Sequence, residues 1–144
     1  MNKTQIWYQS LTKPTWAPDP SVFGIVWPIL YTIIAVTFGT VFYKAFTKEI
    51  PWVVALPFAL NLVFNFAFTP IQFGLKNNIL ASVDIILVLG TLIWALFAIY
   101  SFGLKLHIET GATTYAWIIY ANIPYLLWVF FATVLQLTIT YLNR

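Results

Sequence analysis

Long apolar runs separated by short polar breaks make up the chain from Val22 onward. A helix needs about 20 predominantly apolar residues to cross a bilayer. The first run ends at Lys44, the second before Lys76, and the third at the polar sequence GLKLHIETGAT. The pattern therefore predicts transmembrane helices at residues 22–43, 51–74, 79–102 and 113–142. The last run exceeds one crossing, so it either begins with an interfacial turn or tilts.

The connections between these spans are short, and short connections make successive helices antiparallel neighbours. The expected fold class is therefore an all-α membrane protein, an up-down bundle of four transmembrane helices. We expect it to form a single domain over residues 1–144.

The composition supports a membrane location and excludes several kinds of site. Hydrophobic residues make up 61% of the chain and charged residues 8%, whereas a soluble domain carries roughly a quarter charged residues. The chain has no cysteine and one histidine, which excludes thiol chemistry and a metal site of several histidines. The net charge of +3 is too small to indicate nucleic-acid binding. The N-terminus lacks the apolar region of a signal peptide, and we expect a prokaryotic cell membrane.

Polar residues in the second span lie on one helical face. Asn61, Asn65, Phe68 and Gln72 are spaced 4, 3 and 4 residues apart, which places them in one stripe. Amides in hydrocarbon need hydrogen-bond partners, so the stripe must face the bundle interior. Two interpretations follow: the amides either contact a ligand or join neighbouring helices.

Aromatic residues form similar faces on the first and last spans. Trp27 and Tyr31 lie one turn apart, and Trp128 shares a face with Ala132 and Leu135. Large rings beside a small residue can line a flat, mostly apolar ligand pocket. Core packing or interfacial anchoring is the alternative for any one tryptophan.

Two ionisable residues are further candidates. Asp84 lies near the start of the third span, where its carboxylate either reaches the headgroups or bonds within the bundle. His107 lies in the polar break and is either a haem ligand or a solvated loop residue.

The chain resembles the tryptophan-rich sensory protein / translocator protein family, also called the peripheral-type benzodiazepine receptors. The sequence WYQSLTKPTWAPDPSVFGIVWPILY, which starts at Trp7, resembles that family's long loop and following helix. Three further segments match in the same order and spacing: FNFAFTPIQFG, ASVDIILV and IPYLLWVFFATVLQ. The resemblance covers nearly the whole chain.

The resemblance implies a membrane-embedded pocket for planar hydrophobic ligands. The family has five transmembrane helices, is commonly dimeric, and closes its pocket with the long loop that residues 1–20 resemble. Its ligands are tetrapyrroles such as protoporphyrin IX and haem, synthetic isoquinolines and benzodiazepines, and in some members sterols. No cofactor is required, and some bacterial members are linked to light-dependent porphyrin breakdown.

The resemblance also assigns residues to this pocket. The ligand-binding positions that it implies are Tyr8, Trp16 and Pro18 in the loop, Trp27, Tyr31, Asn65 and Phe68 in the first two spans, and Trp128, Ala132 and Leu135 in the last. Trp27 and Trp128 match the tryptophans implicated in porphyrin photochemistry.

Several features depart from the family pattern. The match begins at the family's first loop, so we expect four spans without the family's first helix. Phe68 stands where many members have tryptophan, and Gln136 replaces a common asparagine. Leu135, Tyr141 and Arg144 fit a loose cholesterol-contact pattern.

The leading functional hypothesis is a membrane-embedded binding protein that senses or regulates porphyrins. A light-dependent porphyrin-degrading enzyme that uses Trp27 and Trp128 as catalytic residues is the alternative. Transport of porphyrin or sterol is a third hypothesis, although the chain lacks the charged pathway and inverted repeat of a carrier. A structural membrane subunit is the fourth.

Overall fold

The structure, a computed structural model, describes residues 10–17, 20–110 and 115–143, apart from the side chains of Pro20, Phe23, Gln72 and Phe73. Its elements are α2 (Pro20–Phe46), α3 (Trp52–Thr69), the π-helical turn η1 (Pro70–Gly74), α4 (Asn78–Thr110), α5 (Ala116–Ala121) and α6 (Ile123–Leu142). The described residues contain no strand. By length and composition, 4 helices can cross a membrane: α2 from Gly24, α3, α4 and α6. The predicted all-α fold and its four spans are confirmed.

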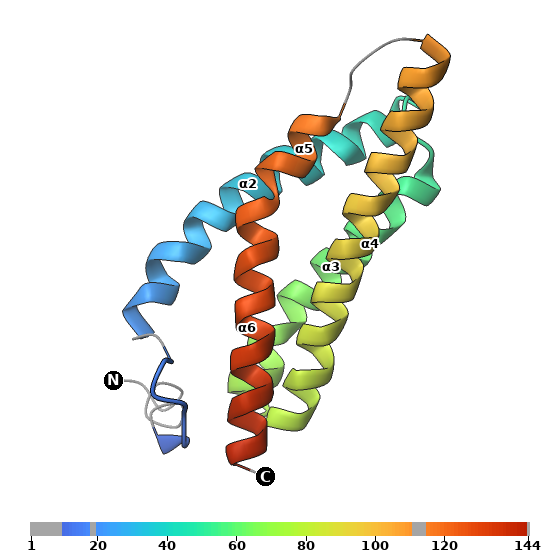
Figure 1. Ribbon diagram of the computed structural model, residues 1–144. Coiled ribbons are helices and arrows are strands. Elements are labelled where there is room, and N and C mark those ends of the chain that lie inside the picture. Colours follow the sequence, from blue (N-terminus) through green and yellow to red (C-terminus); the bar gives the residue numbers. More distant parts are fainter. Residues whose placement is uncertain (1–9, 18–19, 111–114, 144) are drawn as a thin grey trace.

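Helix α4 makes the most extensive helix contacts in the bundle. It packs against α3 on one side and against α6 on the other, whereas α2 leans across the bundle (Figure 1). Phe38 of α2 contacts Phe58 of α3 edge-to-face, with ring centroids 4.8 Å apart, and lies 6.3 Å from the Tyr125 ring of α6. These fully buried rings join the helices at the bundle core.

The first turns of α2 pack less deeply against this core than the rest of the helix. Every buried side chain described in α2 lies at or after Leu30, and those described from Ser21 to Ile29 are exposed or half-buried. Figure 1 shows the same geometry, with α2 diverging from α6 toward its N-terminal end. Pro28 lies inside α2 where this change occurs.

Proline also shapes the end of the second span. Pro70 has no N–H to donate, and the helix widens there into η1, whose Pro70 carbonyl accepts the N–H of Leu75 at 2.9 Å. Lys76 then takes a left-handed conformation with φ 54°. This residue turns the chain toward α4.

The end of α4 differs from the predicted span. The sequence predicts a polar break from Gly103, but α4 continues to Thr110 and includes the exposed residues Lys105, His107 and Glu109. The prediction that these residues form a loop was wrong. Hydropathy marks where the bilayer ends, which need not be where the helix ends. A helix continues beyond it when its residues, such as leucine, lysine and glutamate, favour helix. The last apolar run contains the short helix α5, which ends at Ala121, and Asn122 separates it from α6.

Polar contacts join α2 to the start of α5 at the opposite end from residues 10–17. Lys44 forms an ion pair with Glu49 at 2.8 Å, and its ammonium lies 5.8 Å from the ring centroid of Tyr115. Burial raises the pKa of the Tyr115 phenol, while the charge of Lys44 acts in the opposite direction. The contact between Lys44 and Tyr115 thus links the end of α2 to the start of α5.

Candidate functional site

Aromatic rings from α2 and α6 meet where the first turns of α2 leave the bundle. Trp27 lies edge-to-face against Trp128, with ring centroids 6.5 Å apart and planes at 88°. Trp27 also contacts Tyr31 at 5.3 Å on its own helix, and Trp128 contacts Phe131 at 5.6 Å. The structure thus brings together the two tryptophans that the resemblance assigns to one pocket.

These contacts continue at both ends into one row. Phe131 meets Trp16 at 5.7 Å, and Tyr31 meets Phe66 of α3 at 6.1 Å. Tyr31 is 40% exposed and Phe66 is 59% exposed, so the row presents ring surface outside the packed core. We call this set the aromatic row: Trp16, Phe131, Trp128, Trp27, Tyr31 and Phe66.

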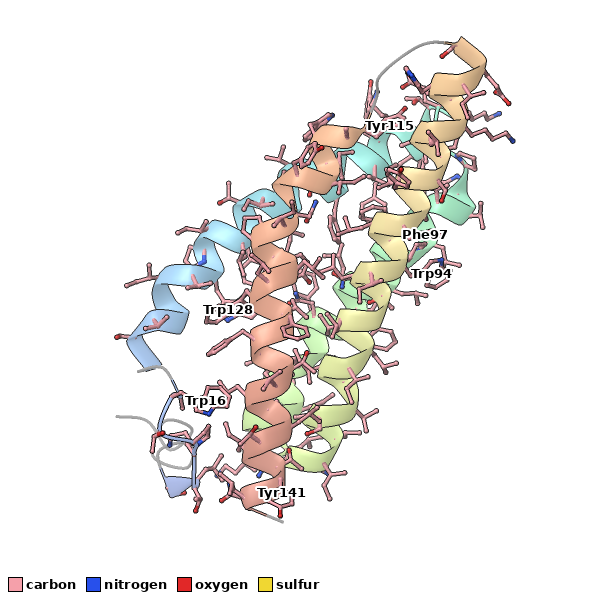
Figure 2. The ribbon with its side chains drawn as sticks, viewed as in Figure 1. Trp16, Trp94, Phe97, Tyr115, Trp128 and Tyr141 are labelled. Atoms are coloured by element: carbon pink, nitrogen blue, oxygen red, sulfur yellow. The ribbon has the colours of Figure 1, made fainter. Side chains whose placement is uncertain are left out.

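The local sequence explains why the row forms. Trp27 and Tyr31 are four residues apart and therefore share a helical face. On α6, Trp128 and Phe131 are three residues apart, and Figure 2 shows Trp128 projecting from α6 on the side of α2. Trp16 comes from the segment before α2. The row thus requires α2, α3, α6 and that segment together.

Phe68 of α3 and Ala132 of α6 are two further predicted ligand positions. Both are half-buried and pack against the main core. Ala132 follows Trp128 by one turn of α6, so the position beside the indole carries only a methyl group. The roles of both residues in ligand contact stay predictions.

Leu135 is covered by the segment of residues 10–17. It is 4% exposed and belongs, with Ile139, to a small buried cluster. Leu11 and Ala17 of the segment pack against this cluster, as does Phe131. Leu135 therefore lies beneath the segment, and contact with a ligand would require the segment to move.

Two hydrogen bonds hold the same segment to the end of α6. The Thr12 N–H donates to Oδ1 of Asn143 at 3.0 Å, and Nδ2 of Asn143 donates to the Thr12 carbonyl at 2.8 Å. One side chain thus satisfies both backbone groups of Thr12. Trp16 gains a fixed place beside Phe131 as a result.

Asn65 belongs to a buried polar network between helices. Its Nδ2 donates to the Tyr125 hydroxyl at 2.6 Å, and that hydroxyl donates to Oδ1 of Asn61 at 2.8 Å. Nδ2 of Asn61 donates to the Val88 carbonyl at 2.9 Å and to Oγ1 of Thr91 at 3.3 Å. The network joins α3, α4 and α6, as expected if the amides of the second span connect neighbouring helices. Direct ligand contact by Asn65 stays a prediction.

The other predicted residues are distributed as follows. Asp84 points into the bundle, where it is 5% exposed and its Oδ2 has no hydrogen-bond partner among the described residues. Tyr8 and Pro18 lie outside the described residues, and the Gln72 side chain is not described. In the described part of the chain, no three or more His, Cys, Asp and Glu side chains could hold a metal ion.

Sequence reasoning missed Phe66, Phe131 and the bridging role of Tyr125. A phenol inside an apolar span needs a partner, and Asn61 and Asn65 supply acceptors and donors on another span. That requirement could have predicted the network. The two phenylalanines carry no such signal, because phenylalanine is common at lipid-facing positions.

Comparison with known proteins agrees with this architecture. The model of the TspO/MBR family matches residues 1–142. Tryptophan-rich protein TspO of Bacillus cereus is 36% identical over 95% of this chain and 80% of the relative. Protein CrtK of Rhodobacter capsulatus is 31% identical over 95% of this chain and 78% of the relative. The human translocator protein is 30% identical over 90% of this chain and 70% of the relative. The family model and these relatives together show that the chain belongs to the TspO/MBR family.

Proposed function

We propose that this protein binds planar, porphyrin-like tetrapyrroles in the membrane of a prokaryotic cell and thereby senses or regulates them. The observation that carries the proposal is the aromatic row, whose rings pass continuously from residues 10–17 across α6 and α2 to α3. A tetrapyrrole is flat and largely apolar, and it stacks on ring faces of this kind. The resemblance to tetrapyrrole-binding proteins supports the same ligand class.

The chemistry of the row suits such a ligand. Each stacked aromatic pair contributes on the order of 0.5–1.5 kcal/mol beyond area burial, and the exposed faces of Tyr31 and Phe66 provide a place for first contact. Lys13 lies three residues before Trp16 and supplies a cation for a porphyrin propionate near the membrane surface. Because the rings of the row already touch, full insertion of a ligand has to separate α2 from α6.

Fluorescence quenching tests this proposal. Protoporphyrin IX is titrated in the dark into the detergent-solubilised protein, and tryptophan emission is recorded. We expect saturable quenching with an affinity that Ala132→Phe weakens about tenfold, since overpacking costs about 1–3 kcal/mol. Ala116→Phe, at an exposed position of α5, is the matched control and should leave the affinity unchanged. Non-saturable quenching, or equal effects of both substitutions, would contradict the proposal.

Contact between Trp27 and Trp128 favours a second candidate, light-dependent oxidative breakdown of the bound porphyrin. Two adjoining indoles beside a chromophore can be oxidised or can pass electrons. Under illumination in air, Trp27→Phe should lower porphyrin loss more than it lowers dark affinity. Trp94→Phe, on the outer face of α4 (Figure 2), should change neither. Equal losses of affinity and turnover in Trp27→Phe would leave binding as the function.

A further inference from the structure

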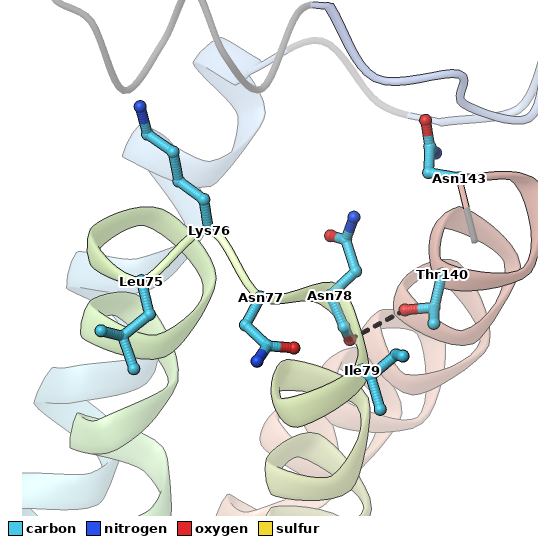
Figure 3. A pocket seen from close by; sticks show the side chains of 7 residues that line it. All are labelled: Leu75, Lys76, Asn77, Asn78, Ile79, Thr140 and Asn143. Carbon is cyan, nitrogen blue, oxygen red and sulfur yellow. Dashed lines mark hydrogen bonds between the residues drawn. The ribbon is translucent and has the colours of Figure 1, made fainter.

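A second region, at the opposite end of α4 from Thr110, is hollowed at the surface. A cavity of about 300 Å³ opens there between the η1–α4 connection and the end of α6, which is at the lower limit of the range for ligand pockets, about 300–1,000 Å³. Figure 3 shows its lining: Leu75, Lys76, Asn77, Asn78, Ile79, Thr140 and Asn143. Residues 75–77 of its lining belong to the connection between two successive spans, so the cavity is at the membrane surface.

The polar wall of this cavity is held rigidly. Oγ1 of Thr140 donates to the Asn78 carbonyl at 2.9 Å and lies 2.6 Å from Oγ of Ser82. One turn deeper, Nε2 of Gln136 donates to Oγ1 of Thr140 at 3.2 Å. These bonds fix α4 against α6 on this side of the cavity.

The charge of the lining favours an anion. None of the lining residues is acidic, and within the described residues Lys76 forms no ion pair. Asn77 accepts the N–H of Leu80 through Oδ1 at 2.9 Å, which leaves its Nδ2 as a donor. The start of α4 lies at the same place, with no acidic residue in its first turn, and adds a partial positive charge. Ammonium and amide donors together suit a phosphate group.

Exposed apolar residues border the same cavity. Leu75 is 66% exposed and Ile79 is 65% exposed. Both lie where the chain enters the bilayer, so their side chains can meet lipid. From Ile79 the exposed side chains of Val83 and Ile86 continue along one face of α4. A ligand in the cavity thus meets donors at one end and a lipid-facing apolar track at the other.

We propose that this cavity binds the phosphate headgroup of an anionic phospholipid. Lys76 and the amide of Asn77 hold the phosphate, and an acyl chain follows the track of Ile79, Val83 and Ile86. The amphiphilic lining favours a lipid over a free phosphate, which would leave the apolar border unused. No residue of the aromatic row lines the cavity, so the proposal does not rest on tetrapyrrole binding.

Native mass spectrometry of the purified full chain in detergent tests this proposal. The protein is titrated with dioleoyl phosphatidylglycerol, dioleoyl phosphatidylcholine, glycerol phosphate or inorganic phosphate. We expect saturable retention of phosphatidylglycerol that Lys76→Gln weakens about fivefold, the effect of one lysine near an anionic lipid. Lys76→Arg should retain the lipid. Lys105→Gln, which removes an exposed cation at the other end of α4, is the matched control and should change nothing.

Three results would overturn the proposal. Equal losses in Lys76→Gln and Lys105→Gln would show that the lipid responds to net charge alone. Competition by glycerol phosphate as effective as that by the lipid would assign the cavity to a soluble phosphate. Equal retention of phosphatidylcholine and phosphatidylglycerol would show that the net negative charge of the lipid, which Lys76 is proposed to bind, does not contribute to binding. Far-UV circular dichroism of each variant shows that it is folded.

Discussion

The hydroxyl of Tyr125 is a single atom through which α6 is bonded to α3. It accepts from Asn65 at 2.6 Å and donates to Asn61 at 2.8 Å, and the three side chains are 0–5% exposed. Tyr125→Phe removes this oxygen and leaves the ring, which still packs against Phe38. The substitution therefore tests the network without testing the core.

The magnitude depends on what the amides do without the hydroxyl. A buried donor or acceptor that loses its partner costs about 1–3 kcal/mol. Interhelical hydrogen bonds in membrane proteins average about 0.6 kcal/mol and reach about 1.7, because the unfolded chain in the membrane also finds partners. Two such bonds are lost at once in a site that water cannot easily enter. We therefore expect Tyr125→Phe to lower the free energy of unfolding by about 1–3 kcal/mol.

Unfolding by sodium dodecyl sulfate in mixed micelles, followed by circular dichroism, measures this change. Tyr100→Phe makes the same chemical change at an exposed position of α4 and should alter stability by less than about 0.5 kcal/mol. Adding Asn65→Leu to Tyr125→Phe should cost less than the sum of the two single changes, since the partners are removed together. A stability loss in Tyr125→Phe no larger than that in Tyr100→Phe would refute this account of the network.

Two further changes probe the ends of the bundle. Asn143→Ala removes both bonds to Thr12. We expect faster amide hydrogen exchange in residues 10–17 and no change in the exchange of α4. Unchanged exchange in residues 10–17 would show that other contacts hold this segment. Glu49→Gln disrupts the ion pair with Lys44. In the same unfolding assay it should lower the free energy of unfolding by less than about 1 kcal/mol, because both side chains are partly exposed. A larger loss would show that this pair is one of the main contacts that stabilise α2.

The number and order of the spans could be predicted from hydropathy, because crossing the bilayer requires a minimum apolar length whatever the tertiary contacts. Helix ends were predicted less well. The polar residues that end the third apolar run remain helical up to Thr110, and Pro70 produces a widened turn inside the predicted span of residues 51–74. Hydropathy reports the solvent around a helix, and the helix ends depend on backbone bonds and local propensity.

The candidate site was predictable where it depends on spacing within one helix. Trp27 with Tyr31, and Asn61 with Asn65, follow directly from helical periodicity. Contacts between distant segments were not predictable in this way. The Thr12–Asn143 bonds join residues 131 positions apart, and no periodic pattern encodes that pairing. The same limit applies to Trp16 and Phe131.

The structure indicates which helix moves when a ligand enters the aromatic row. Hydrogen bonds to both α3 and α4 hold α6, through Tyr125 and through Thr140. None of the described side chains of α2 before Leu30, in contrast, is fully buried, and only Val26 and Trp27 among them pack, half-buried, against the core. Pro28 lies at the boundary and weakens the helix there, since it lacks an N–H and its ring crowds the preceding turn. We therefore expect the first turns of α2 to pivot at Pro28 and carry Trp27 away from Trp128.

The absence of cysteine from the sequence makes this expectation directly measurable by paired spin labels. Ile25→Cys with Leu127→Cys reports across the pivoting turns and α6, and Val36→Cys with Leu127→Cys reports on the packed half of α2; all three positions are exposed. Protoporphyrin IX should lengthen the first distance and leave the second unchanged. If both distances lengthen together, α2 moves as a rigid rod and Pro28 is not the pivot. If neither changes while quenching still saturates, the ligand stacks on the exposed rings of Tyr31 and Phe66 without opening the row.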